Sequence, residues 1–145
     1  MTLSELRAEL KIRMRNRTDV SDTRYNSFIN TAILAMAADR RLQFPAIERL
    51  NDTWVTTVQS TRVYALPTDT LMILAVRDRT NNRKLTQSHW RIFDRITQIN
   101  GFPTRYARFG ADLEFDPIPD GAYLIRLRDR RRPAVLTGTD SSPFG

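Results

Sequence analysis

Residues 62–78 constrain the fold more than any other stretch, because their pattern predicts a strand, a corner and a second strand. The residues from Val63 to Leu66 favour β structure, and Pro67 ends the ladder because proline has no N–H to donate. Leu71–Val76 is a continuous apolar run, which is typical of a strand covered on both faces. The rest of the chain must therefore supply two covering layers.

The first 44 residues are predicted to be helical. Thr2 and Glu5 have the spacing of a capping box, and apolar residues then recur at helical intervals, so we expect a helix over 3–16. Ser21 or Asp22 would cap a second helix that extends to about residue 42. This second helix is apolar over much of its circumference, which indicates that it packs on more than one neighbour.

The remainder is predicted to be mainly β structure, over residues 53–86 and 102–129, with a short helix at about 89–98. Residues 59–61 are expected to form a hairpin turn between two of the strands. Residues 134–145 show no periodicity and should be extended or disordered unless a partner orders them. The predicted fold class is α+β, a helical hairpin or bundle packed with an antiparallel sheet region, within one domain of 145 residues.

The basic residues are almost all arginine. The formal net charge is +7, and only Lys11 and Lys84 are lysine among 23 basic residues. Arginine is favoured in bidentate, partly buried contacts and at protein interfaces. Nucleic-acid binding and a GC-rich genome are competing explanations of the same bias. No apolar run approaches the roughly 20 residues that a membrane helix needs, so we expect no membrane partner.

The usual patterns of enzyme sites are missing from the sequence. All five glycines lie at or beyond Gly101, so no glycine-rich phosphate loop precedes the β region. The chain has no cysteine and one histidine, His89, for which a structural role is favoured. Asp112, Glu114 and Asp116 alternate along one strand; we favour pairing with neighbouring arginines over a divalent-cation or general-acid site. We therefore expect no enzyme activity, no catalytic or metal-binding residues and no cofactor.

Ordered motifs along nearly the whole chain resemble the head–tail connector, or adaptor, proteins of tailed bacteriophages and phage-like gene transfer particles. The resemblance begins with TLSELRAEL in the first predicted helix and TRYNSFINTAILAMAADR in the second. The later motifs are Tyr64-x-Leu66-Pro67-x-Asp69, Gly101-x-Pro103-x-x-Tyr106, Leu113-x-Phe115-x-Pro117-x-Pro119-Asp120 and Tyr123-x-Ile125-x-Leu127, ending at Pro133.

The resemblance implies a structural protein of the virion neck, assembled in the host cytoplasm. Such adaptors form a ring, usually a dodecamer, that binds beneath the portal protein, contacts a tail or stopper protein and continues the channel for packaged DNA. Similar family members usually continue past residues 141–145 into another helix, so either this product is short or the sequence is part of a longer one.

The candidate subunit or partner interface consists of basic residues late in the chain and two residues near its end. These are Arg126, Arg128, Arg130, Arg131, Arg132, Pro143 and Phe144. A basic, nonspecific DNA-binding module is the alternative function, because the same arginines could follow a phosphate backbone. A small hydrolase or nuclease using the acidic strand is a third, weaker hypothesis.

Overall fold

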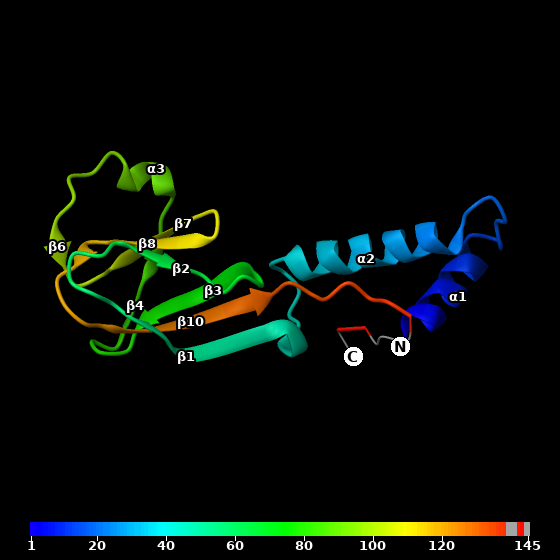
Figure 1. Cartoon of the computed structure of the whole chain (residues 1–145), viewed down its shortest axis with the longest axis horizontal. Helices are drawn as coiled ribbons and strands as arrows, with labels where there is room; N and C mark the ends of the chain where they lie inside the picture. Colours follow the sequence, from blue (N-terminus) through cyan, green and yellow to red (C-terminus); the bar gives the residue numbers. More distant parts are fainter. Residues whose placement is uncertain (139–141, 144–145) are drawn as a thin grey trace. The chain divides into compact units, whose positions relative to one another are not determined.

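The computed structural model describes residues 1–138, 142 and 143, and its contacts divide the chain into two compact units. Met1–Glu48 and Arg131–Gly145 form one, which we call the helical unit, and Arg49–Arg130 form the other, the β unit. The predicted α+β class is confirmed, since N-terminal helices are followed by sheets that are mostly antiparallel (Figure 1).

Helix α1 (Leu3–Arg13) begins with the predicted capping box, in which Thr2 and Glu5 each accept a hydrogen bond from the other's backbone N–H. The helix ends three residues before the predicted end at residue 16. Arg15 and Asn16 adopt positive φ angles of 58° and 51°, which an α-helix excludes.

Helix α2 (Asp22–Ala38) begins at the predicted cap Ser21 and ends four residues before the predicted end at residue 42. Asp39 is extended, and its carboxylate accepts a hydrogen bond from the backbone N–H of Arg41 at 2.9 Å. An aspartate that bonds the backbone two residues later competes with helix continuation, so the helix stops there. A single 3₁₀ turn, η1 (Pro45–Ile47), follows.

The core of the helical unit includes a residue of the segment after the β unit. Leu136 is buried with Leu3, Ile29 and Ile33, and both its backbone groups bond the Asn30 side chain, at 2.8 and 3.3 Å. The segment around Leu136 is neither helix nor strand. At this residue the segment is held by α2 of the same chain.

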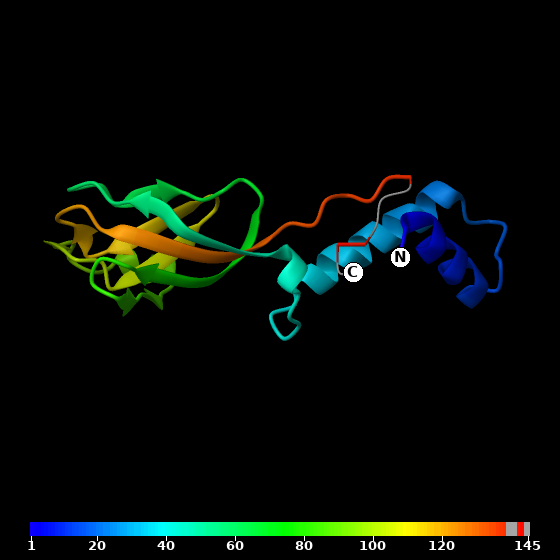
Figure 2. The same cartoon turned by 90° about the horizontal axis from the view of Figure 1, so that it is seen from below.

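The β unit contains two four-stranded sheets and a small two-stranded one. The first has the order β1-β10-β3-β4, from Glu48–Thr56, Leu124–Arg131, Thr70–Asp78 and Arg83–Lys84. The second has the order β2-β8-β7-β5, from Val63–Ala65, Asp112–Asp116, Arg105–Phe109 and Thr86–Gln87. The small one pairs β6 (Asn100–Gly101) with β9 (Ile118–Pro119). Figure 2 shows β10 in orange between β1 and β3.

The predicted strand–corner–strand is present, and the corner carries the chain from one sheet to the other. Tyr64 of β2 pairs with Leu113 of β8, whereas β3 lies beside β10. Pro67 closes the corner by accepting a hydrogen bond from the N–H of Thr70 at 3.0 Å. Both faces of β3 contain buried residues, such as Met72 and Ile73, as the apolar run indicates.

The core of the β unit lies between the two sheets. Ile125 and Leu127 of β10 face Leu113 and Phe115 of β8, and all four side chains have 0% exposure. The intervening Arg126 is half-buried, which agrees with the alternation predicted for this strand. Tyr64, Ile73, Val76 and Tyr106 belong to the same cluster.

Two local predictions in the β unit were wrong. No hairpin joins β1 to β2, because these strands belong to different sheets. The short helix α3 (Trp90–Phe93) covers only part of the predicted 89–98. His89 caps it by accepting a hydrogen bond from the N–H of Arg91 at 3.2 Å, and β-branched residues such as Thr97 disfavour its continuation.

Candidate interaction surfaces

An apolar groove lies between α1 and α2 of the helical unit. Its volume is about 480 Å³, within the roughly 300–1,000 Å³ of sites that take a sizeable ligand. Phe28 and Met36 on its wall are 46% and 43% exposed. The described residues that line it are Leu6, Glu9, Leu10, Arg13, Phe28, Ile29, Ala32, Ile33, Met36 and Ser142.

The sequence of α2 accounts for the groove. Ile29 and Ile33 are buried in the hairpin core, while Phe28 and Met36 lie on the neighbouring stripe, which α1 leaves open. The small side chain of Ala32 leaves a hollow between them. Glu9 and Arg13 at the rim pair with each other at 3.0 Å. Such a lining suits an apolar segment of a protein partner, because few polar groups are available for chemistry.

The breadth of the apolar stripe on α2 was the sequence signal for this groove. It predicted a second neighbour for the helix, but it gave no means of telling which residues the hairpin would bury and which it would leave exposed.

The predicted interface arginines occupy different environments. Arg126 is half-buried and forms an ion pair with Asp52, which also pairs with Arg79 at 3.1 Å. Arg128 is exposed, whereas Arg130 is only 1% exposed and is part of the interior. Only the exposed members of this set are therefore available to a partner.

The other predicted interface residues belong to the helical unit. Arg131 and Arg132 are exposed, and Pro143 is half-buried. Phe144 lies outside the described residues. Arg126, Arg128 and Arg130 lie in the β unit.

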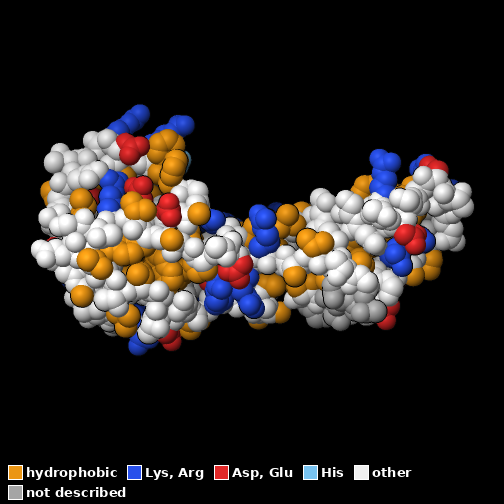
Figure 3. All heavy atoms as spheres, in the orientation of Figure 1, with side chains coloured by type: hydrophobic (Ala, Val, Ile, Leu, Met, Phe, Trp, Pro, Cys, Tyr) orange, Lys and Arg blue, Asp and Glu red, His pale blue; other side chains and the backbone are white. Residues whose placement is uncertain are grey.

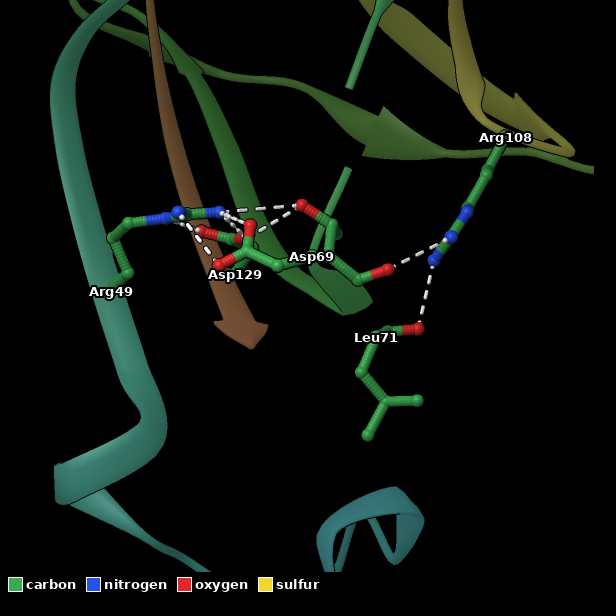
Figure 4. A network of polar contacts seen from close by, with 6 residues as sticks. Arg49, Asp69, Leu71, Arg108 and Asp129 are labelled. Carbon is green, nitrogen blue, oxygen red and sulfur yellow. Dashed lines mark hydrogen bonds and ion pairs between the residues drawn. The ribbon is translucent and has the colours of Figure 1, made fainter. Parts of the chain in front are cut away.

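A polar network that sequence reasoning missed ties β1 to the proline corner (Figure 4). Arg49 of β1 donates to Asp129 of β10 at 2.6 Å and to Asp69 at 2.9 Å. Thr70 donates its hydroxyl to the same Asp129 at 2.7 Å, and Asp129 is 0% exposed. The hydrogen bonds that Arg49 donates to Asp129 and Asp69 raise the pKa of Arg49 above its ordinary value, and Asp129 is the larger cause. The buried carboxylate of Asp129 thus has partners on both β1 and β3.

Arg108 of β7 bridges the two sheets. Its guanidinium donates to the backbone carbonyls of Leu71 at 2.9 Å and Thr70 at 3.2 Å, as Figure 4 shows. The planar fork of arginine reaches both carbonyls at once. The arginine bias of the sequence is thus partly explained by contacts inside the β unit.

Glu114 and Asp116 of the acidic strand pair with arginines, as favoured from the sequence. Glu114 lies 3.0 Å from Arg62, and Asp116, which is 6% exposed, accepts from Arg105 at 3.0 Å. Within the described part of the chain, no group of three potential ligands is placed to hold a metal ion. Among the same residues, no helix has the length and apolar character needed to cross a membrane.

Comparison with known protein families gives one match over almost the full length. A family model described as SU10 adaptor protein matches residues 1–144. No curated protein matches the chain.

Proposed function

The chain belongs to the SU10 adaptor protein family, a family of phage structural adaptors, and from this membership we propose that it forms a ring between the portal and the tail components of a virion. About twelve copies form one ring beneath the portal protein. The ring contacts a tail or stopper protein and leaves a central passage for packaged DNA. The protein acts by assembly, and it performs no chemical step.

The observation that carries the proposal is the family match over residues 1–144. The groove between α1 and α2 supports it, because an exposed apolar hollow is typical of a surface that a partner covers. A ring supplies such a partner through a contact repeated from copy to copy.

The placement of the arginines disfavours the alternative of a nonspecific DNA-binding module. Arg49, Arg62 and Arg105 are bound to carboxylates inside the β unit, and Arg108 to backbone carbonyls. Arginines already paired in this way have less charge available for phosphates than free ones. We propose that the remaining exposed arginines give the wall of the DNA passage its positive charge, since the formal net charge of the chain is +7.

Localisation in isolated particles tests the proposal. Antibody labelling or cryo-electron microscopy of particles should place the protein between capsid and tail, in symmetric copies. Finding it absent from complete particles would contradict the proposal.

A further inference from the structure

The outer face of the first sheet begins with two arginines of β10. Ile125 and Leu127 point into the core between the sheets, so the alternate residues Arg126 and Arg128 point outward. Arg128 is exposed and Arg126 is half-buried. Figure 2 views this sheet from its outer side, with the strands of the second sheet behind it.

The neighbouring strands extend this basic group. Arg77 of β3 follows the core residue Val76 and pairs across the strands with Lys84 of β4, which precedes the core residue Leu85. Both side chains are exposed and point away from the core. Because β4, β3 and β10 are adjacent in the sheet, these basic residues lie on one side of three neighbouring strands. We call this surface the basic face, and its members are Arg77, Lys84, Arg126 and Arg128.

The positive charge of the basic face is mostly uncompensated. Arg126 shares the carboxylate of Asp52 with Arg79. Arg77 donates to the neutral side chain of Asn82 at 2.7 Å. Among the described residues, none forms an ion pair with the other three members of the basic face. Three cations of this face are therefore available to an anionic partner.

The outer face of the second sheet has a different character. Asp112 and Glu114 of β8 alternate with the core residues Leu113 and Phe115, and Glu114 pairs with Arg62 at 3.0 Å. Figure 3 shows acidic and basic side chains close together over α3, on the same side. Carboxylates and guanidiniums thus meet on this face, whereas the basic face has an excess of cations.

The size of the basic face suits a short stretch of a nucleic-acid backbone. Neighbouring strands lie about 4.8 Å apart, so three strands span roughly 10 Å. One strand of duplex DNA carries a phosphate about every 3.4 Å along the helix axis, which places about three phosphates within that span. The centre of a protein–protein interface, in contrast, is depleted of charged residues. A polyanion therefore fits the basic face better than a protein partner does.

We infer that the basic face binds the phosphate backbone of duplex DNA. The inference rests on the proposed function and adds the surface of each copy that lines the DNA passage. Contacts to phosphates carry no sequence information, so any packaged sequence is accepted. Three uncompensated cations set the slope of log K against log[salt] at roughly −2.7 per copy. Such a contact is weak enough for DNA to slide past it.

Neutralising the basic face tests the inference in the purified protein. Fluorescence anisotropy with a labelled duplex oligonucleotide at several salt concentrations measures the slope of log K against log[salt]. Each of Arg77→Gln, Lys84→Gln and Arg128→Gln should reduce the steepness of this slope by about 0.9, and the triple variant should bring the slope close to zero. Because the three positions are exposed, the variants should fold normally, which circular dichroism verifies.

The matched control removes the same charge from the helical unit. Arg15→Gln/Arg24→Gln/Arg40→Gln changes three exposed arginines of that unit and should leave the slope as it is in the unchanged protein. Sedimentation velocity verifies that both triple variants have the same assembly state, so that their slopes can be compared.

Two outcomes would overturn the inference. The first is an equal slope for the two triple variants, which would mean that the basic face does not contact the duplex. The second is tighter binding of a labelled poly-glutamate peptide than of the duplex at the same salt concentration, which would indicate an acidic protein partner. Neither outcome contradicts the proposed function, because the position of the protein in particles tests that function separately.

Discussion

The guanidinium of Arg49 lies 2.6 Å from the carboxylate of Asp129, a side chain with no solvent exposure, although 80 positions separate the two residues. The pair joins β1 to β10, and Asp69 brings the proline corner to the same guanidinium at 2.9 Å. The corner that dominates the sequence pattern is thus held by a residue from a distant strand.

Removing Arg49 should destabilise the protein strongly. Arg49→Met leaves Asp129 buried without its cation, which costs about 3–5 kcal/mol for pairs of this kind. Urea unfolding followed by tryptophan fluorescence measures the change. Asp69→Asn is the control, and because Asp69 is 45% exposed it should cost less than about 1 kcal/mol. A small effect of Arg49→Met, equal to that of the control, would show that the pair contributes little.

The capping box of α1 should make helix stability depend on pH. The backbone N–H of Thr2 donates to Glu5 at 2.7 Å and lowers the pKa of that carboxyl below its ordinary 4.5. A lowered pKa means that the stabilisation is complete above pH 4.5 and is lost as the pH falls through the lower, folded-state pKa. Circular dichroism at 222 nm during urea unfolding should show this loss, and Glu5→Gln should remove it.

Thr2→Ala tests the other half of the box. It should cost about 1 kcal/mol at neutral pH, the usual value for a lost N-cap. An unchanged unfolding free energy would mean that the cap does not contribute to folding.

Polar substitution in the groove between α1 and α2 should impair assembly and leave the folded chain intact. Phe28→Ser removes an apolar side chain from the groove wall, so copies or partners that cover the groove lose buried area. Ile12→Ser is the matched control, because Ile12 is an exposed helical residue, at 65%, outside the groove lining. Sedimentation velocity should show reduced assembly for Phe28→Ser alone. Equal assembly of both variants would exclude the groove as an interface.

The salt dependence of DNA binding separates the adaptor from the nonspecific DNA-binding module. Arg49, Arg62 and Arg105 are paired with carboxylates and should add little to phosphate binding, so we expect a slope of log K against log[salt] shallower than roughly −3. Fluorescence anisotropy with a duplex oligonucleotide at several salt concentrations measures it. A loss of about 10³ in affinity between 50 and 200 mM salt would favour the DNA-binding module instead.

Local sequence patterns predicted most of the helices and strands, but they could not predict contacts between residues far apart in the sequence. The Thr2–Glu5 box, the corner at Pro67 and the alternation of Ile125 and Leu127 are each encoded within a few residues. Helix ends were predicted less well, because they depended on the left-handed Asn16 and on the side chain of Asp39. Both signals are local, but nearby apolar residues that continue the helical pattern obscured them.

The interaction surfaces were harder to predict, because they combine residues that only the tertiary fold brings together. Arg126, Arg128 and Arg130 alternate along one strand, and a period of two predicts a shared face, yet Arg130 is buried. A small pocket lined by Trp90, Asp94, Phe109 and Glu114 combines residues from α3, β7 and β8, which only the tertiary fold brings together. Arg49 and Asp129 gave no sequence signal of their contact, since a pair 80 positions apart follows no local spacing.

End-on electron micrographs of the assembled protein test the central proposal most directly. We predict closed, symmetric rings of identical copies with an open centre wide enough for duplex DNA. A protein that stays monomeric at all concentrations and is missing from the neck of purified particles would contradict it.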